Sequence, residues 1–228
     1  MRLIDNIIEF ATSNGTPTSV VLRNCLVLAY KLNNQRLKTW VIKELEGYVE
    51  GDQVPEYRHI RITAKGTFFG PLGAQLNNQP LPSSILKKEH RNWANNALLF
   101  EPIAAYESVT DVKVNLIINW PPDLIAMYQS DFVKGYVLKD AWLEIPAPAV
   151  IALVDTVRNR VLSFTLEIRE ELGMAGDDIE AISSDKIEKT VINNIYGGNI
   201  VIAGTIDKSP VQQGSEQAVM SQSFQRED

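Results

Sequence analysis

One polar cluster in the chain has residue types and a spacing that could support chemistry. Asp155 and Arg158 are three positions apart within the segment 154–162, so on a helix their side chains can pair on one face. Apolar neighbours favour partial burial of such a pair, either as an ion pair that orients the core or as one wall of a polar cleft. We favour the structural interpretation, with Arg23 of an earlier helix as a candidate partner across the bundle. The predicted binding or structural cluster therefore consists of Arg23, Asp155, Arg158 and Asn159.

Residue types for metal-dependent or nucleophilic catalysis are few and scattered. The histidines His59 and His90 and the single cysteine, Cys25, fall in three different predicted elements and lack the spacing of metal ligands. The glycines of segments 70–73 and 196–198 lack the spacing and the lysine of a phosphate-binding loop. We therefore predict no metal and no cofactor. The catalytic residue is unknown, and an enzyme is the less favoured class.

The composition indicates a soluble protein with a substantial core. The chain has 228 residues, 45% of them hydrophobic, which fits one good-sized domain plus an appendage. The formal net charge of −6 repels nucleic acid and anionic lipid, so neither nucleic acid nor a membrane is an expected partner. Apolar runs end well before the roughly 20 residues needed to cross a bilayer. With one cysteine and therefore no intrachain disulfide, we expect a cytoplasmic protein.

Hydrophobic periodicity predicts an α+β fold, with a predominantly helical body and a small antiparallel sheet over residues 1–172. Apolar residues at helical spacing predict helices at 1–12, 17–32, 35–47, 89–110 with a break at Pro102, 123–129 and 146–172. Side chains that alternate between two faces predict strands at 57–64 and 112–118, and an irregular loop through Pro82 follows the first of them. The segment 136–145 fits a strand or a helix. We favour a strand, because a small sheet needs a partner there.

The segments beyond this body predict an element for assembly. Residues 173–185 have the composition of a linker, and residues 209–228 that of a disordered tail. Between them, residues 186–208 are rich in branched aliphatic side chains and predict a β-strand or hairpin. Such a hairpin is marginal alone and would aggregate if exposed, so it either folds back on the body or pairs between copies. The second alternative is slightly favoured and predicts a homo-oligomer, formed through Ile195, Tyr196, Ile200 and Ile202.

Several segments of the body together resemble the AbiTii family of abortive-infection proteins. They occur in this order: 22–32 (LRNCLVLAYKL), 40–48 (WVIKELEGY), 55–58 (PEYR), 70–73 (GPLG), 102–108 (PIAAYES), 120–124 (WPPDL) and 153–162 (LVDTVRNRVL). The resemblance covers roughly residues 1–172 and implies a role in bacterial defence against phage, in which the infected cell is halted before phage release. It implies no reaction and transfers no catalytic residue. The segment around Tyr196-Gly197-Gly198-Asn199 resembles short strand segments at the ends of varied bacterial proteins.

Three functional hypotheses follow. The favoured one is an interaction or effector module that self-associates through its C-terminal strand and responds to a phage or host protein. The main rival is a toxic enzyme, a nuclease or nucleotide hydrolase, that could use Asp155, Arg158, Glu101 or Glu107. A nucleic-acid sensor is the third, although the acidic net charge argues against it. Its candidate residues are Arg58, Arg61, Lys87, Lys88 and Arg91.

Overall fold

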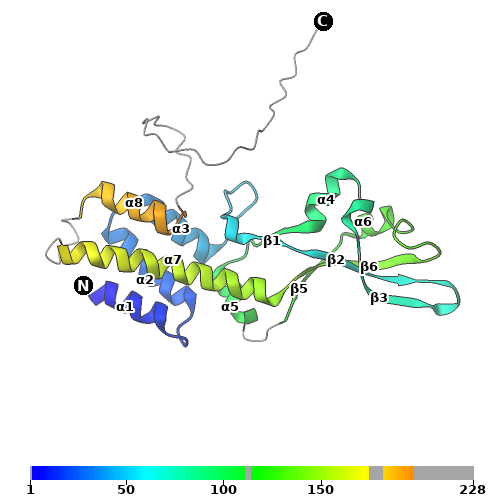
Figure 1. Cartoon of the computed structure of the whole chain (residues 1–228), viewed down its shortest axis with the longest axis horizontal. Helices are drawn as coiled ribbons and strands as arrows, with labels where there is room; N and C mark the ends of the chain where they lie inside the picture. Colours follow the sequence, from blue (N-terminus) through cyan, green and yellow to red (C-terminus); the bar gives the residue numbers. More distant parts are fainter. Residues whose placement is uncertain (1, 111–113, 175–181, 198–228) are drawn as a thin grey trace, which may run out of the picture.

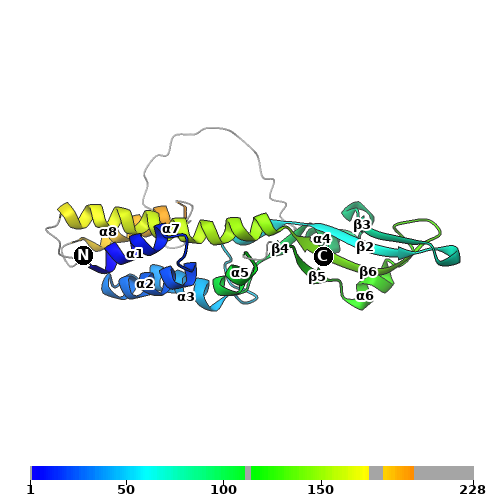
Figure 2. The same cartoon turned by 90° about the horizontal axis from the view of Figure 1, so that it is seen from below.

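A bundle of helices and a twisted antiparallel sheet lie at opposite ends of an elongated molecule (Figure 1). The computed structural model describes residues 2–110, 114–174 and 182–197. The bundle contains α1 (Arg2–Thr12), α2 (Thr18–Lys31), α3 (Gln35–Glu46), α5 (Ile103–Thr110), α7 (Ala147–Met174) and α8 (Ser184–Asn194). The long helix α7 packs against α1, α2, α5 and α8, and its N-terminal end meets the sheet (Figures 1 and 2). In this way α7 joins the two parts of the molecule.

The bundle forms because each helix buries an apolar stripe. Ile4 and Ile7 of α1, and Val157 and Val161 of α7, repeat at intervals of three or four residues and are almost fully buried. The short turn between α2 and α3 places Asn34 at the start of α3, where its side-chain Oδ1 accepts a hydrogen bond from the backbone N–H of Leu37 at 2.8 Å. The three N-terminal helices predicted from periodicity are therefore confirmed.

The main sheet has four antiparallel strands in the order β3-β2-β6-β5. Their bounds are β2 (Thr63–Phe69), β3 (Gln75–Pro80), β5 (Leu116–Asn119) and β6 (Val137–Ile145). A separate pair, β1 (His59–Arg61) and β4 (Asn96–Leu98), lies between the bundle and this sheet. Phe68, Trp93, Trp120, Tyr128 and Phe132 form an aromatic cluster that joins the sheet to α4 (Lys88–Asn95) and α6 (Pro122–Met127). The α+β class and the strand at 136–145 are confirmed.

Two local predictions in the middle of the chain are wrong. The predicted loop before Pro82 contains β3, whose polar side chains face solvent and therefore show no hydrophobic alternation. The predicted helix 89–110 is divided by β4, since residues 96–98 pair with β1 and Ala97 is buried. In both places long-range strand pairing overrides a weak local preference.

The predicted strand at 186–208 begins as a helix instead. Ser183 caps α8, and Ile187, Val191 and Ile195 recur every four residues and bury one face of the helix within the bundle. Up to Ile195, the branched side chains that suggested a strand are thus at helical spacing. Tyr196 donates a hydrogen bond from its hydroxyl to the backbone oxygen of Arg36 at 3.1 Å, so the two proposed self-association residues at 195 and 196 pack within the same chain.

The other parts of the C-terminal predictions lie mostly outside the described residues. Helix α7 extends to Met174, and α8 begins at Ser184, so both ends of the predicted 173–185 linker are helical. Residues 175–181, the proposed self-association residues Ile200 and Ile202, and the 209–228 tail are outside the described ranges. None of the described helices is long and apolar enough to cross a membrane.

Burial makes Cys25 an unreactive thiol. It is fully enclosed by the helical core, and burial raises the pKa of the thiol to about 12. Because the thiolate is the reactive form, we expect iodoacetamide at pH 8 to leave the native chain unmodified and to label one cysteine after denaturation. Intact mass before and after adding denaturant measures this. Rapid labelling of the native protein would contradict the buried position.

Candidate functional site

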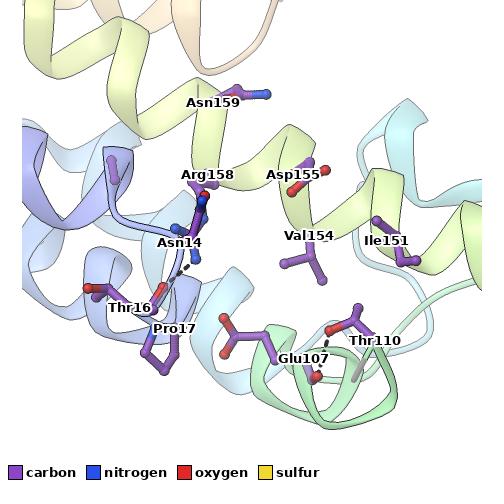
Figure 3. A pocket seen from close by; sticks show the side chains of 12 residues that line it. Asn14, Thr16, Pro17, Glu107, Thr110, Ile151, Val154, Asp155, Arg158 and Asn159 are labelled. Atoms are coloured by element: carbon purple, nitrogen blue, oxygen red, sulfur yellow. Dashed lines mark hydrogen bonds between the residues drawn. The ribbon is translucent and has the colours of Figure 1, made fainter. Parts of the chain in front are cut away.

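A polar groove of about 560 Å³ lies where the α1–α2 loop, α5 and α7 meet (Figure 3). It contains three of the four residues predicted as a cluster, Asp155, Arg158 and Asn159, all from α7. Arg158 and Asn159 follow Asp155 by three and four positions, which places all three on one side of that helix, above α5. The opposite wall includes Glu107 of α5 and Thr16 of the loop. This is the strongest candidate for a functional site in the part of the chain that the structure describes.

Arg158 holds the α1–α2 loop in place and does not pair with Asp155. Its Nη1 donates to the backbone oxygen of Ser13 at 2.8 Å, its Nη2 donates to that of Thr16, and its Nε donates to the Thr18 hydroxyl at 3.1 Å. The guanidinium has donors on three nitrogens, so one side chain can fix two backbone oxygens of the loop and the hydroxyl at the start of α2. The predicted partnership within α7 is therefore wrong. Arg158 is a positioning residue whose partners are oxygens of the loop and of the first residue of α2.

Glu107 completes the start of α2. That helix begins after Pro17, which supplies no side-chain cap. The carboxylate of Glu107 instead accepts hydrogen bonds from the backbone N–H groups of Thr18 and Ser19, the latter at 3.2 Å. A carboxylate is favourable there because the first N–H groups of a helix lack internal partners and carry partial positive charge. The sequence suggested Glu107 only as a residue of the enzymatic alternative. Its capping role could not be predicted, because Thr18 lies 89 positions away in the sequence.

The remaining members of the predicted cluster are dispersed. Asp155 and Asn159 are exposed on α7, and Figure 3 shows both on the same wall of the groove. Arg23 is exposed on α2 and does not line the groove, so the predicted contact across the bundle is wrong. The open groove therefore offers the exposed carboxylate of Asp155 and the amide oxygen of Asn159 as hydrogen-bond acceptors, while the Glu107 carboxylate is engaged by the start of α2. Its chemistry fits recognition of groups that donate hydrogen bonds.

A second polar cluster is completely buried and joins the bundle to β1 and β4. Glu44 of α3 and Arg58 form an ion pair with Nη2 and Oε2 at 2.6 Å, and both side chains are inaccessible to solvent. Arg58 Nη1 also donates to the backbone oxygens of Leu99 and Glu101, at 2.6 and 3.0 Å. Each of the three guanidinium nitrogens of Arg58 thus has a hydrogen-bond partner within the protein. Residues far apart in the sequence are fixed together here.

Three tyrosines surround the buried pair. The hydroxyls of Tyr48 and Tyr57 donate to Glu44 Oε1 at 2.8 and 2.7 Å, and the guanidinium of Arg58 lies over the rings of Tyr48 and Tyr106. Burial raises the pKa of Tyr48 and Tyr57, and the Glu44 carboxylate raises both further. The phenols therefore stay protonated and serve as donors. This satisfied, enclosed network is structural.

The positions of the basic residues weaken the nucleic-acid hypothesis. Arg58 is buried, and Arg91 donates hydrogen bonds to the backbone oxygens of Leu86 and Ser84, at 2.9 and 3.0 Å. The other candidates stay dispersed over β1 and the start of α4. The prediction that Arg58 contacts phosphate is therefore wrong, because its buried guanidinium cannot reach a ligand without unfolding the core.

The histidines and the other acidic candidate do not join the groove. His59 contacts the backbone oxygen of Val54 at 3.2 Å, and His90 contacts the Tyr128 hydroxyl at 2.7 Å. Glu101 contributes backbone groups to the buried network, while its side chain is exposed. Within the described ranges, no three histidine, cysteine or acidic side chains gather as metal ligands. Each of these residues has a local structural contact.

Comparison with known proteins places these features in a family. A search of curated proteins gave no match, and a search of solved structures gave none either. The family model AbiTii, however, matches residues 2–194, which include the bundle, the sheet, the groove and the buried Arg58 network. This range is far more than half of the 228 residues. The chain belongs to the AbiTii family, whose name denotes abortive infection, a defence against phage.

Proposed function

We propose that this chain acts in the cytoplasm as an interaction or effector module of abortive infection and associates with copies of itself through its C-terminal segment. The family match over residues 2–194 is the observation that carries the defence role. The module would respond to a phage or host protein by binding it. Recognition, with no cofactor or metal, is the activity that the groove chemistry favours.

The groove supports binding more readily than catalysis. Arg158 already has three oxygen partners, and Glu107 caps a helix, so both charged groups serve the local structure. Asp155 and Asn159 are exposed and available to a partner. A protein loop that presents backbone N–H groups or a lysine would complement these acceptors. The surface is therefore suited to a protein trigger.

Self-association is proposed to depend on the segment after Gly197. The sequence Asn199-Ile200-Val201-Ile202 is uncharged and rich in β-branched residues, which is the composition that favours strand pairing between chains. We expect Ile202→Lys to lower the average mass of the full chain in light scattering, since a charge would interrupt the apolar run. A mass equal to that of the unmodified protein would refute this part of the proposal.

Asp155→Asn tests the groove with little risk to folding. Asp155 is exposed, so we expect the free energy of unfolding to change by less than about 0.5 kcal/mol. Protection against phage, measured as plaque number on cells that express the chain, is expected to fall. Asp123→Asn, an acid-to-amide change in the first turn of α6, is the matched control. Full protection by Asp155→Asn would exclude its carboxylate from recognition.

The enzymatic alternative gives a different result in the same experiments. If the chain is a toxic nuclease or nucleotide hydrolase, purified wild-type protein should degrade nucleic acid or nucleotide, and Asp155→Asn should abolish that activity at unchanged stability. Arg158→Met cannot make this distinction by itself. Loss of its three hydrogen bonds is expected to destabilise the fold by about 2–3 kcal/mol.

A further inference from the structure

The two outer strands of the four-stranded sheet are very different. Strand β3 carries glutamine and asparagine side chains and ends at Pro80, and a register shift interrupts its pairing with β2. Polar side chains, proline and irregular pairing are features by which natural sheets prevent further strands from adding. Strand β5, at the opposite edge, has the sequence Leu-Ile-Ile-Asn: three of its four side chains are apolar, it contains no proline, and its pairing with β6 has no register shift. One edge of the sheet is thus protected and the other is open.

Exposed apolar side chains mark β5 as the open edge. Ile117 is 59% exposed and Ile118 is 42% exposed, although they point to opposite faces of the sheet. Ile118 also lines a mainly apolar hollow of about 710 Å³ between β5 and the β1–β4 pair, together with Trp93, Leu98 and Leu143. Adjacent branched residues exposed on both faces of an edge strand are unusual in a monomer, because they favour pairing with another chain.

The backbone of β5 can accept a further strand. Register pairs Ile118 with Leu143, and the backbone N–H of Trp120 donates to the oxygen of Ala141 at 2.9 Å. Hydrogen-bonded and non-hydrogen-bonded pairs alternate in an antiparallel ladder, so Ile118 is also bonded to β6. The N–H and C=O groups of Ile117 and Asn119 consequently point away from β6. They form two sets of donors and acceptors along the open edge.

We propose that β5 pairs antiparallel with β5 of a second copy of this chain, around a twofold axis that passes between the two Ile118 residues. In this register Ile117 lies opposite the partner's Asn119, and Asn119 lies opposite the partner's Ile117, so each outward N–H meets a C=O. The two Ile118 side chains pack against each other beside the apolar hollow. Two four-stranded sheets thereby become one continuous sheet.

Charge and geometry favour a second copy as the occupant. Residues 116–119 carry no charge, so self-pairing brings no like charges together across the edge. An antiparallel pair of identical strands is symmetric, as a closed dimer requires. Because β3 is protected, the described strands of the dimer leave no second open edge through which the four-stranded sheets could grow. This contact is independent of the C-terminal segment proposed above and uses only described residues.

Variants of the full chain test the β5 contact. Light scattering over a range of concentrations should find a species of twice the 25.5 kDa chain mass. Ile117→Lys is expected to remove that species, since it places two lysines at the paired edges. Ile117→Pro should do the same, because it removes an outward N–H and leaves the bonds to β6 intact. Leu72→Lys, at a fully exposed turn, is the matched control and should retain the dimer.

Combining these variants with Ile202→Lys separates the two contacts. Loss of the dimer in Ile117→Lys and Ile117→Pro, with Ile202→Lys still dimeric, supports the β5 contact and contradicts association through the C-terminal segment. If only Ile202→Lys loses the dimer, the result supports association through the C-terminal segment and overturns the β5 proposal. If all variants with native circular dichroism stay dimeric, or if the wild type is monomeric at all concentrations, the proposal is also overturned.

Discussion

Replacing Glu44 with glutamine is expected to lower the free energy of unfolding by about 3–5 kcal/mol, because it leaves the buried charge of Arg58 without its counterion. Glutamine has nearly the same shape, so the loss reports the charge and not a cavity. The change also weakens the acceptor shared by the hydroxyls of Tyr48 and Tyr57. Urea denaturation followed by circular dichroism measures the effect.

Glu46→Gln is the matched control for this prediction. Glu46 lies on the same helix, α3, but is exposed, so the same chemical change should alter stability by less than about 0.5 kcal/mol. Equal stability of the two variants would mean that the Glu44–Arg58 pair contributes nothing to the fold. Arg58→Met combined with Glu44→Leu should recover part of the loss, since an apolar pair requires no counterion.

Gly47→Ala is expected to destabilise the protein by about 2–5 kcal/mol, through backbone strain and a steric clash together. Gly47 ends α3 with φ of +94° and ψ of 176°, a conformation almost restricted to glycine. An added Cβ would lie 2.8 Å from the backbone oxygen of Phe100, the same atom that accepts a hydrogen bond from the N–H of Tyr48. Thermal and urea denaturation should both show the loss.

Gly51 separates the two causes. It has the same φ of +94°, but an added Cβ would meet no atom within 4 Å. Gly51→Ala should therefore cost only the conformational strain, about 1–2 kcal/mol. Gly47→Ala should lose more stability than Gly51→Ala, because only at position 47 does the new Cβ also clash with residues 100–102. If both variants lose the same stability, the contact with Phe100 is not tightly packed.

The sequence by itself determined the elements that have a strong local period. The three N-terminal helices and α7 follow from apolar residues at helical spacing, whereas the local pattern of β6 fits a strand or a helix and only the pairing with β2 and β5 decides it. It also identified Asp155, Arg158 and Asn159 as neighbours on α7. Such features depend on residues within a few positions of each other, so their physical cause is present in the local sequence.

Only the tertiary structure decided which side chains meet across large sequence separations. Arg158 has its partners near residues 13–18, Glu107 caps α2, and Arg58 is enclosed by Glu44 and three tyrosines. Strand β3 and helix α8 likewise depend on the surfaces they pack against, which outweigh weak or misleading local preferences. The sequence does not indicate whether a charged side chain faces water, a helix end or a buried counterion, because its environment depends on how the whole chain packs.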